Sequence, residues 1–190
     1  DGTFWIGTDD DLVEFSDGRF TNIAKTGQVN DLFVDREQHV WIAGRDLLRY
    51  DRRPMTPLNR AGTQLHPTRK LLQTRDGALW VGTDVVQFKN DVATHYSEGD
   101  GFIGGNVTSL FEDSHGGVWI GTNRGVSHFD GQKFASPMFH DHPGIPTVNA
   151  ITEDTNGDIW LGMPGGVAIY DQESMREHDT QDTDTTILTG

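Results

Sequence analysis

The histidine pair His140 and His142 is the most compact group of metal-ligand side chains in the sequence. The two residues flank Asp141 in the segment FHDHPG. On a strand, an H-x-H spacing places both rings on one face and can begin a metal site, whereas in a proline-bounded loop the same side chains are ordinarily solvated. We favour the second interpretation and predict no metal and no cofactor.

Carboxylates are plentiful, but their spacing does not favour catalysis. Glycoside hydrolysis needs two carboxylates that converge about 5–10 Å apart in a cleft. Asp35, Asp113 and Asp154 instead recur at one place in a repeat, and Asp76 stands two positions further along the same turn. The G-x-S-x-G motif of serine hydrolases does not occur. We therefore predict that the chain is not an enzyme and has no catalytic residue.

Two arginines stand in turns whose sequence varies along the chain. Arg45 lies in GRDL and Arg124 lies in TNRG. A guanidinium group can bind a carboxylate or a sulfate through two parallel hydrogen bonds, so both residues are candidates for anion binding. The alternative is that they pair with Asp46 and neighbouring acids.

The elements that position these residues form a repeat of roughly forty residues. Every tryptophan lies in one motif, which reads FWIGT, VWIAG, LWVGT, VWIGT or IWLGM. The five residues are Trp5, Trp41, Trp80, Trp119 and Trp160, at intervals of 36, 39, 39 and 41 residues. Joining the ends of the chain gives a fifth interval of 35 residues. Such a period is typical of stacked repeats, and we expect all five tryptophans to be structural.

Each copy of the repeat reads as four short strands. In the fourth copy the strands are VTSLFED, VWIGT, VSHFD and KFASP, and glycine-containing turns separate them. Glycine accepts positive φ without steric cost, as hairpin turns require. The second strands are continuously apolar, which indicates that both of their faces are covered. Propeller blades that stack face to face meet this requirement.

We therefore predict an all-β fold, a β-propeller of five four-stranded blades that forms a single domain over residues 1–190. Blade 1 combines residues 185–190 with 1–23, and the others span 28–60, 68–99, 106–138 and 147–178. The segment TTILTG at 185–190 supplies a first strand that residues 1–23 lack. Pairing of these N- and C-terminal strands would close the ring and remove exposed strand edges.

The composition narrows the choice of partners. The 15 basic and 29 acidic residues leave a formal charge of −14, which repels nucleic acid and anionic membranes. No apolar run is long enough to span a bilayer, so we expect no direct membrane insertion. The chain has no cysteine and therefore needs no disulfide.

The stretch from Asp100 to Asp130, DGFIGGNVTSLFEDSHGGVWIGTNRGVSHFD, resembles the two-component regulator propeller repeat. The resemblance implies the sensor part of a hybrid histidine kinase, in the periplasm or outside the cell, often with polysaccharide breakdown products as ligands. Copy two departs from the pattern, because Glu37, Gln38 and His39 replace the turn glycine. We interpret this departure as drift.

Binding sites of propellers concentrate on the rim around the channel mouth, where the loops between second and third strands emerge. The rim candidates for ligand binding are Arg45, Asp46, Asp84, Asn123, Arg124, His140 and His142. We expect a sensing module that binds a saccharide or another small polar or anionic molecule there. The alternatives are a scaffold that docks a protein partner, such as its parent signalling protein, and a propeller lyase or glycoside hydrolase. Few aromatic residues are expected on this rim, which weakens the prediction of a saccharide.

Overall fold

The computed structural model describes residues 2–52, 55–57, 70–82, 85–90, 92–136, 147–170 and 175–179. These ranges are almost entirely β-structure, and their only helix is the short 3-10 turn η1 (Glu98–Asp100). None of their helices has the length and apolar character needed to cross a membrane. The chain divides into two compact units, Asp1–Tyr96 and Ser97–Gly190.

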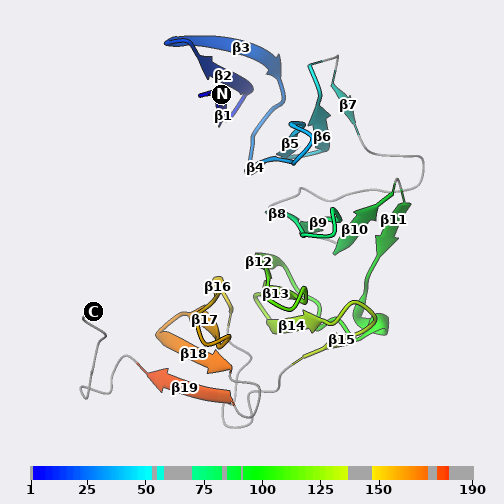
Figure 1. Cartoon of the computed structure of the whole chain (residues 1–190), viewed down its shortest axis with the longest axis vertical. Coiled ribbons are helices and arrows are strands. Elements are labelled where there is room, and N and C mark those ends of the chain that lie inside the picture. Colours follow the sequence, from blue (N-terminus) through cyan, green and yellow to red (C-terminus); the bar gives the residue numbers. More distant parts are fainter. Residues whose placement is uncertain are drawn as a thin grey trace. The chain divides into compact units, whose positions relative to one another are not determined.

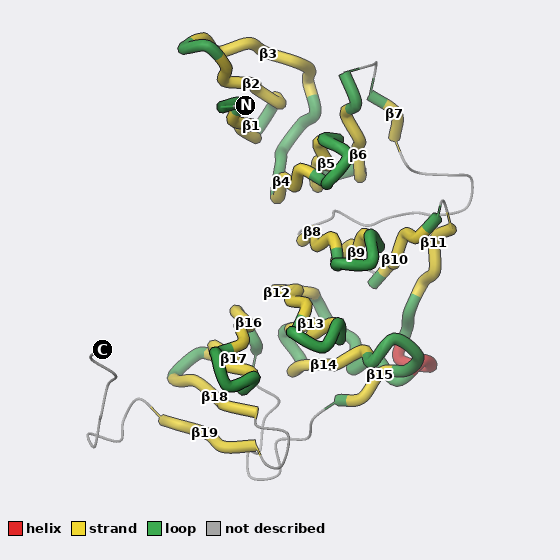
Figure 2. Tube along the Cα trace, in the orientation of Figure 1, coloured by secondary structure: helices red, strands yellow, loops and turns green. Residues whose placement is uncertain are grey.

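The first unit contains three antiparallel sheets whose strands are joined in chain order (Figures 1 and 2). The first sheet comprises β1 (Phe4–Gly7), β2 (Asp11–Ser16) and β3 (Arg19–Lys25). The second comprises β4 (Asp31–Val34), β5 (Val40–Ala43), β6 (Leu47–Tyr50) and β7 (Thr56–Pro57). The third comprises β8 (Lys70–Gln73), β9 (Leu79–Gly82), β10 (Val86–Lys89) and β11 (Val92–His95). Because β4 lies near both β1 and β8, neighbouring sheets face one another.

The second unit contains two further antiparallel sheets with the same strand order. The fourth sheet comprises β12 (Val107–Glu112), β13 (Val118–Thr122), β14 (Gly125–Phe129) and β15 (Phe134–Ala135). The fifth comprises β16 (Ala150–Glu153), β17 (Ile159–Met163), β18 (Gly166–Tyr170) and β19 (Met175–Asp179). Here β12 lies beside β16, so these two sheets also face one another.

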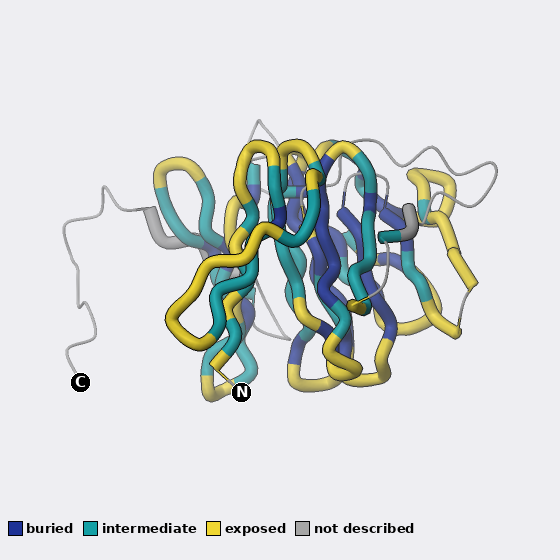
Figure 3. Tube along the Cα trace, turned by 90° about the horizontal axis from the view of Figure 1, so that it is seen from above, coloured by how far each residue is buried: buried dark blue, intermediate teal, exposed yellow. Residues whose placement is uncertain are grey.

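The core of each unit lies between adjacent sheets. Trp41 packs against Leu79 and Val81 of the third sheet, and Trp119 packs against Leu161 of the fifth. Figure 3 shows that buried residues concentrate in the strands and exposed residues in the turns. Burial of one indole contributes about 4–6 kcal/mol as an upper bound. The tryptophan motif therefore stabilises the contact from one sheet to the next.

The prediction of an all-β fold with five antiparallel sheets is confirmed for the described residues. Four sheets have four strands, and the first has three. The strand predicted to complete the first sheet, 185–190, lies outside the described residues, so ring closure stays a prediction. The grouping of all five blades into one domain likewise stays a prediction from the sequence.

A carboxylate organises the turn between the first and second strands of three sheets. In the fourth sheet, Oδ1 of Asp113 accepts the backbone N–H groups of His115 and Gly117 at 2.9 and 2.8 Å. Its Oδ2 accepts the indole N–H of Trp119 at 2.9 Å. Asp35 and Asp154 do the same for Trp41 and Trp160. The acidic turn thus orients the indole, which confirms that these carboxylates serve turns.

Candidate functional site

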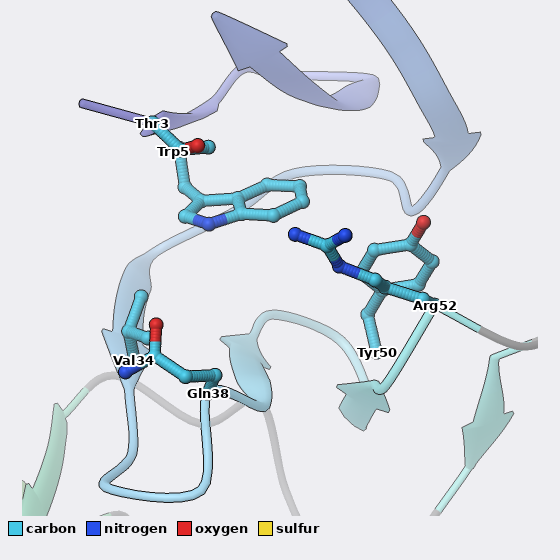
Figure 4. Close-up of a pocket in the computed structure, with 6 residues that line it drawn as sticks. All are labelled: Thr3, Trp5, Val34, Gln38, Tyr50 and Arg52. Atoms are coloured by element: carbon cyan, nitrogen blue, oxygen red, sulfur yellow. The ribbon is translucent and has the colours of Figure 1, made fainter. Parts of the chain in front are cut away.

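A pocket of about 210 Å³ opens between the first two sheets, within the first unit. It is lined by Thr3, Trp5, Val34, Gln38, Tyr50 and Arg52, and we call it the Trp5 pocket. Figure 4 shows the side chain of Arg52 directed toward the indole of Trp5, with the ring of Tyr50 beside it. These residues come from β1, from the ends of β4 and β6, and from the turns that follow them.

Polar links join neighbouring sheets at the end of a first strand. Between the second and third sheets, the backbone N–H of Arg36 donates to the side chain of Gln73 at 3.2 Å. Between the fourth and fifth, the N–H and the hydroxyl of Ser114 both donate to Glu153 at 2.6 Å. The position of Gln73 and Glu153 is occupied in the second sheet by Val34, which cannot accept such a bond and is 41% exposed. Val34 lines the Trp5 pocket.

Trp5 is also less covered than Trp41, Trp80 and Trp119. His128 stacks on Trp119 in the fourth sheet with ring centroids 4.4 Å apart, and it is the cross-strand partner of that tryptophan. The cross-strand partner of Trp5 is Glu14, which offers no ring. Tyr50 meets Trp5 edge-on at 5.6 Å and 66°. The indole is consequently only half-buried, whereas Trp119 is 3% exposed.

The indole N–H of Trp5 lacks the partner that other copies have. Trp41, Trp119 and Trp160 each donate to an aspartate of the preceding turn. No residue in the described ranges accepts a hydrogen bond from Trp5. The position six residues before Trp5, which corresponds to those aspartates, precedes Asp1.

Two lining residues occupy backbone conformations that favour glycine. Gln38 has φ +67° and Arg52 has φ +65°. The residues equivalent to Gln38 are Gly2, Gly77, Gly116 and Gly157, and the described residues equivalent to Arg52 are Asp17, Asn90 and Gly131. All seven also have positive φ. A long side chain in this region costs about 1–2 kcal/mol relative to an ordinary backbone conformation, and such strain concentrates at functional sites.

The carboxylates of the turns are not suited to proton donation. Burial alone would raise the pKa of Asp113, but hydrogen bonds from Trp119 and from the Gly117 amide hold that pKa below its ordinary value. Burial would also raise the pKa of Asp76, but hydrogen bonds from Lys89 and Thr74 outweigh this effect and lower that pKa to about 2. A general acid needs a pKa near the working pH, so these carboxylates are poor candidates for that role.

One trio of side chains near the pocket has the composition of a metal site. Asp35, Glu37 and His39 place ligand atoms within 4.8 Å of one another. Nδ1 of His39 lies 2.9 Å from Oδ2 of Asp35. That oxygen already accepts the indole N–H of Trp41, and Oδ1 accepts the amides of Glu37 and His39. The lone pairs of Asp35 are therefore engaged in holding its turn, which is their structural use here.

The predicted rim residues have separate roles. Nη1 of Arg124 pairs with Oε1 of Glu98 at 2.7 Å, and Oδ1 of Asn123 accepts the backbone N–H of Asn106 at 2.8 Å. A Cβ at Gly105 would lie 2.6 Å from that Oδ1, so this connector packs closely on its turn. Arg124 therefore pairs with a nearby acid, the alternative raised from its sequence, although the acid is Glu98.

Arg45 is exposed, and Asp46 is half-buried in the same turn. Asp84, His140 and His142 lie outside the described residues. The assignment of these seven residues as ligand contacts stays a prediction.

Sequence reasoning did not place a site at the Trp5 pocket. Its signal was present in copy two, where Gln38 replaces the turn glycine, but that departure was interpreted as drift. Arg52, which replaces the glycine of the later FDG turn, was not singled out. The contact between Trp5 and Tyr50 joins residues of different repeats and has no signature within either one.

The comparisons with known proteins identify the repeat. Residues 101–124 match the family model described as two component regulator propeller. This segment contains the connector, β12, its acidic turn and β13 of the fourth sheet. No curated protein matches the chain.

Several solved structures have a similar fold. The extracellular domain of a putative hybrid two component system from B. thetaiotaomicron has a TM-score of 0.72 at 20% identity, over 94% of this chain and 29% of that one. The extracellular domain of a putative one component system from the same organism has a TM-score of 0.74 at 18% identity, over 95% of this chain and 26% of that one. A virginiamycin B lyase from Staphylococcus aureus has a TM-score of 0.69 at 12% identity, over 96% of this chain and 68% of that one.

The chain thus spans less than a third of each of the two extracellular domains. At these identities the likeness concerns the fold, which is that of propeller blades. The chain carries a repeat of the two-component regulator propeller family, as its sequence predicts.

Proposed function

We propose that this chain is a non-catalytic ligand-binding module of an extracytoplasmic sensor, and that the Trp5 pocket is its binding site. The ligand is a small polar molecule or saccharide. Extracellular domains of a putative hybrid two component system and of a putative one component system are among the similar structures and support the sensor role, and so does the family repeat at 101–124.

The choice of site rests on one observation. Gln38 stands where all four other copies have glycine, Arg52 stands where three copies have glycine, asparagine or aspartate and the fifth has Gln172, and both line the Trp5 pocket. The fold would be less strained with glycine at either position, so its architecture does not explain their presence. Trp5 and Tyr50 add the aromatic surface that a saccharide needs.

Calorimetry and thermal shift with a panel of sugars, sugar acids and small carboxylates test this proposal. A ligand at a hundredfold excess over Kd should stabilise the fold by about 2.7 kcal/mol. The double variant Gln38→Gly, Arg52→Gly should lose this stabilisation without a lower melting temperature, because both changes relieve strain. Asn90→Gly is the matched control, since it changes the turn equivalent to that of Arg52 but does not line the pocket.

Two results would contradict the proposal. If binding persists in the Gln38→Gly, Arg52→Gly variant and disappears in Arg45→Ala, Arg124→Ala, the site lies on the rim. If any ligand is chemically converted during the titration, the module is an enzyme, as the lyase among its structural neighbours is.

A protein-interaction role is the second candidate, and exposed phenylalanines of the first sheet favour it. Phe4 and Phe20 are 63% and 71% exposed and flank Phe15 across the three strands. In the fourth sheet, Phe134 occupies the position of Phe20, and Phe102 of the connector contacts it with ring centroids 5.8 Å apart. Sedimentation of the wild type and of Phe20→Ser tests this role: concentration-dependent association that the substitution abolishes would support it.

A further inference from the structure

We infer that the Trp5 pocket selects a small ring compound that bears a carboxylate group, with Arg52 as the residue that determines this specificity. The inference rests on the proposed function and narrows its ligand class. Arg52 binds the carboxylate, and the indole of Trp5 packs against the flat face of the ring.

The pocket lining carries a positive charge from Arg52. Arg52 is the only charged side chain among the described residues that line the pocket, although the whole chain has a formal charge of −14. Two other cations are neutralised locally: Lys89 lies 2.6 Å from Asp76, and Arg124 lies 2.7 Å from Glu98. Arg52 forms no ion pair or hydrogen bond with any residue in the described ranges. Its guanidinium is thus available for an anion, which it can bind through two parallel hydrogen bonds.

The arrangement of Trp5 and Tyr50 leaves room for a flat ring in the pocket. Tyr50 touches Trp5 edge-on, an arrangement that leaves indole surface facing the pocket (Figure 4). A volume of about 210 Å³ is smaller than the roughly 300–1,000 Å³ of sites for drug-sized ligands, so a single ring fits better than an oligomer. Aromatic side chains bind flat carbon faces, whether these belong to an aromatic ring or to a pyranose.

Hydrogen-bond donors are present among the described residues that line the pocket. Arg52 supplies guanidinium donors, and Gln38 can donate or accept through its amide. None of these described residues carries a carboxylate, so they complement a ligand that presents acceptor oxygens.

Calorimetric titration of the chain with benzoate and with glucuronate tests the inference. Benzyl alcohol and glucose are the neutral counterparts, and sodium sulfate is the anion without a ring. We expect at least one acid to bind roughly tenfold more tightly than its neutral counterpart, because hydrogen bonds to charged groups are worth more than neutral ones. Arg52→Gln should remove this preference and leave the affinity for the neutral compound unchanged.

Two further variants make the assignment specific. Arg49→Gln is the matched control, because Arg49 lies over Trp41 at 5.8 Å in the same sheet and does not line the pocket. It should keep the preference for the acid. Trp5→Phe should abolish the change in tryptophan emission that the ligand causes, with the other four tryptophans unaffected.

The outcomes separate the inference from the function on which it rests. If no compound binds, both fail. If neutral compounds bind as tightly as the acids, or if Arg52→Gln keeps the preference, the inference fails while the proposed function stands. If sulfate binds as tightly as the acids, the role of the ring is wrong and the inference fails.

Discussion

Trp119→Ala should destabilise the chain strongly, because the indole fills the space between the fourth and fifth sheets. Trp119 is 3% exposed, packs against Val148 and Leu161, and donates its N–H to Asp113 at 2.9 Å. An indole of about 150–250 Å² gives about 4–6 kcal/mol at the usual area coefficient, and measured truncations of buried tryptophan cost about 3–5 kcal/mol. We expect a loss in the latter range.

Urea unfolding followed by far-UV circular dichroism measures this loss, and Trp5→Ala is the comparison. Trp5 is half-buried and its N–H has no partner in the described ranges, so its loss should be smaller by at least about 1 kcal/mol. Asp130→Ala, in an exposed outer turn, should change the unfolding midpoint little. Equal losses for Trp119→Ala and Trp5→Ala would refute the assignment of Trp119 to the core between sheets.

The remaining predictions concern the backbone strain at Gln38, the loss of stability in acid that involves Asp76, and the completion of the first sheet by residues 185–190. Gln38→Gly should raise the free energy of unfolding by about 1 kcal/mol, measured by urea unfolding, and a loss would show that the positive φ is not strained. The pKa of Asp76 is about 2 when folded and near 3.9 when unfolded, so its contribution is complete above about pH 4 and is lost as the pH falls toward 2. Asp76→Asn should therefore flatten the dependence of stability on pH in that window. If the dependence is unchanged in this variant, Asp76 is not its cause. Deletion of residues 185–190 should lower the melting temperature if TTILTG completes the first sheet, and an unaltered temperature would reject that pairing.

The sheets could be predicted because their signal is local and repeated. Each tryptophan motif marks a second strand, and its period orders the sheets without knowledge of long-range contacts. The role of Asp113 could also be predicted, since the turn and the indole it serves lie within six residues of it. The Trp5 pocket could not, because it depends on a contact between Trp5 and Tyr50 that no single repeat encodes.

The family match and the candidate site fall in different parts of the chain for a physical reason. The matched segment 101–124 contains features that every blade needs, such as the turn carboxylate and the apolar second strand. The pocket contains the residues by which one blade departs from the others. A search for resemblance therefore finds the architecture and passes over the part that is particular to this protein.

The positive φ of Gln38 and Arg52 has a practical consequence for protein engineering. A common way to obtain a more robust repeat protein is to replace each residue with the one most frequent at that position among the copies. Applied here, that procedure would write glycine at position 38, where all four other copies have it, and would remove a lining side chain of the pocket. The engineered chain would express and melt better than the natural one, and a stability assay alone would score it as an improvement. Averaging across repeats should therefore exempt positions where a side chain is kept against the preference of the backbone.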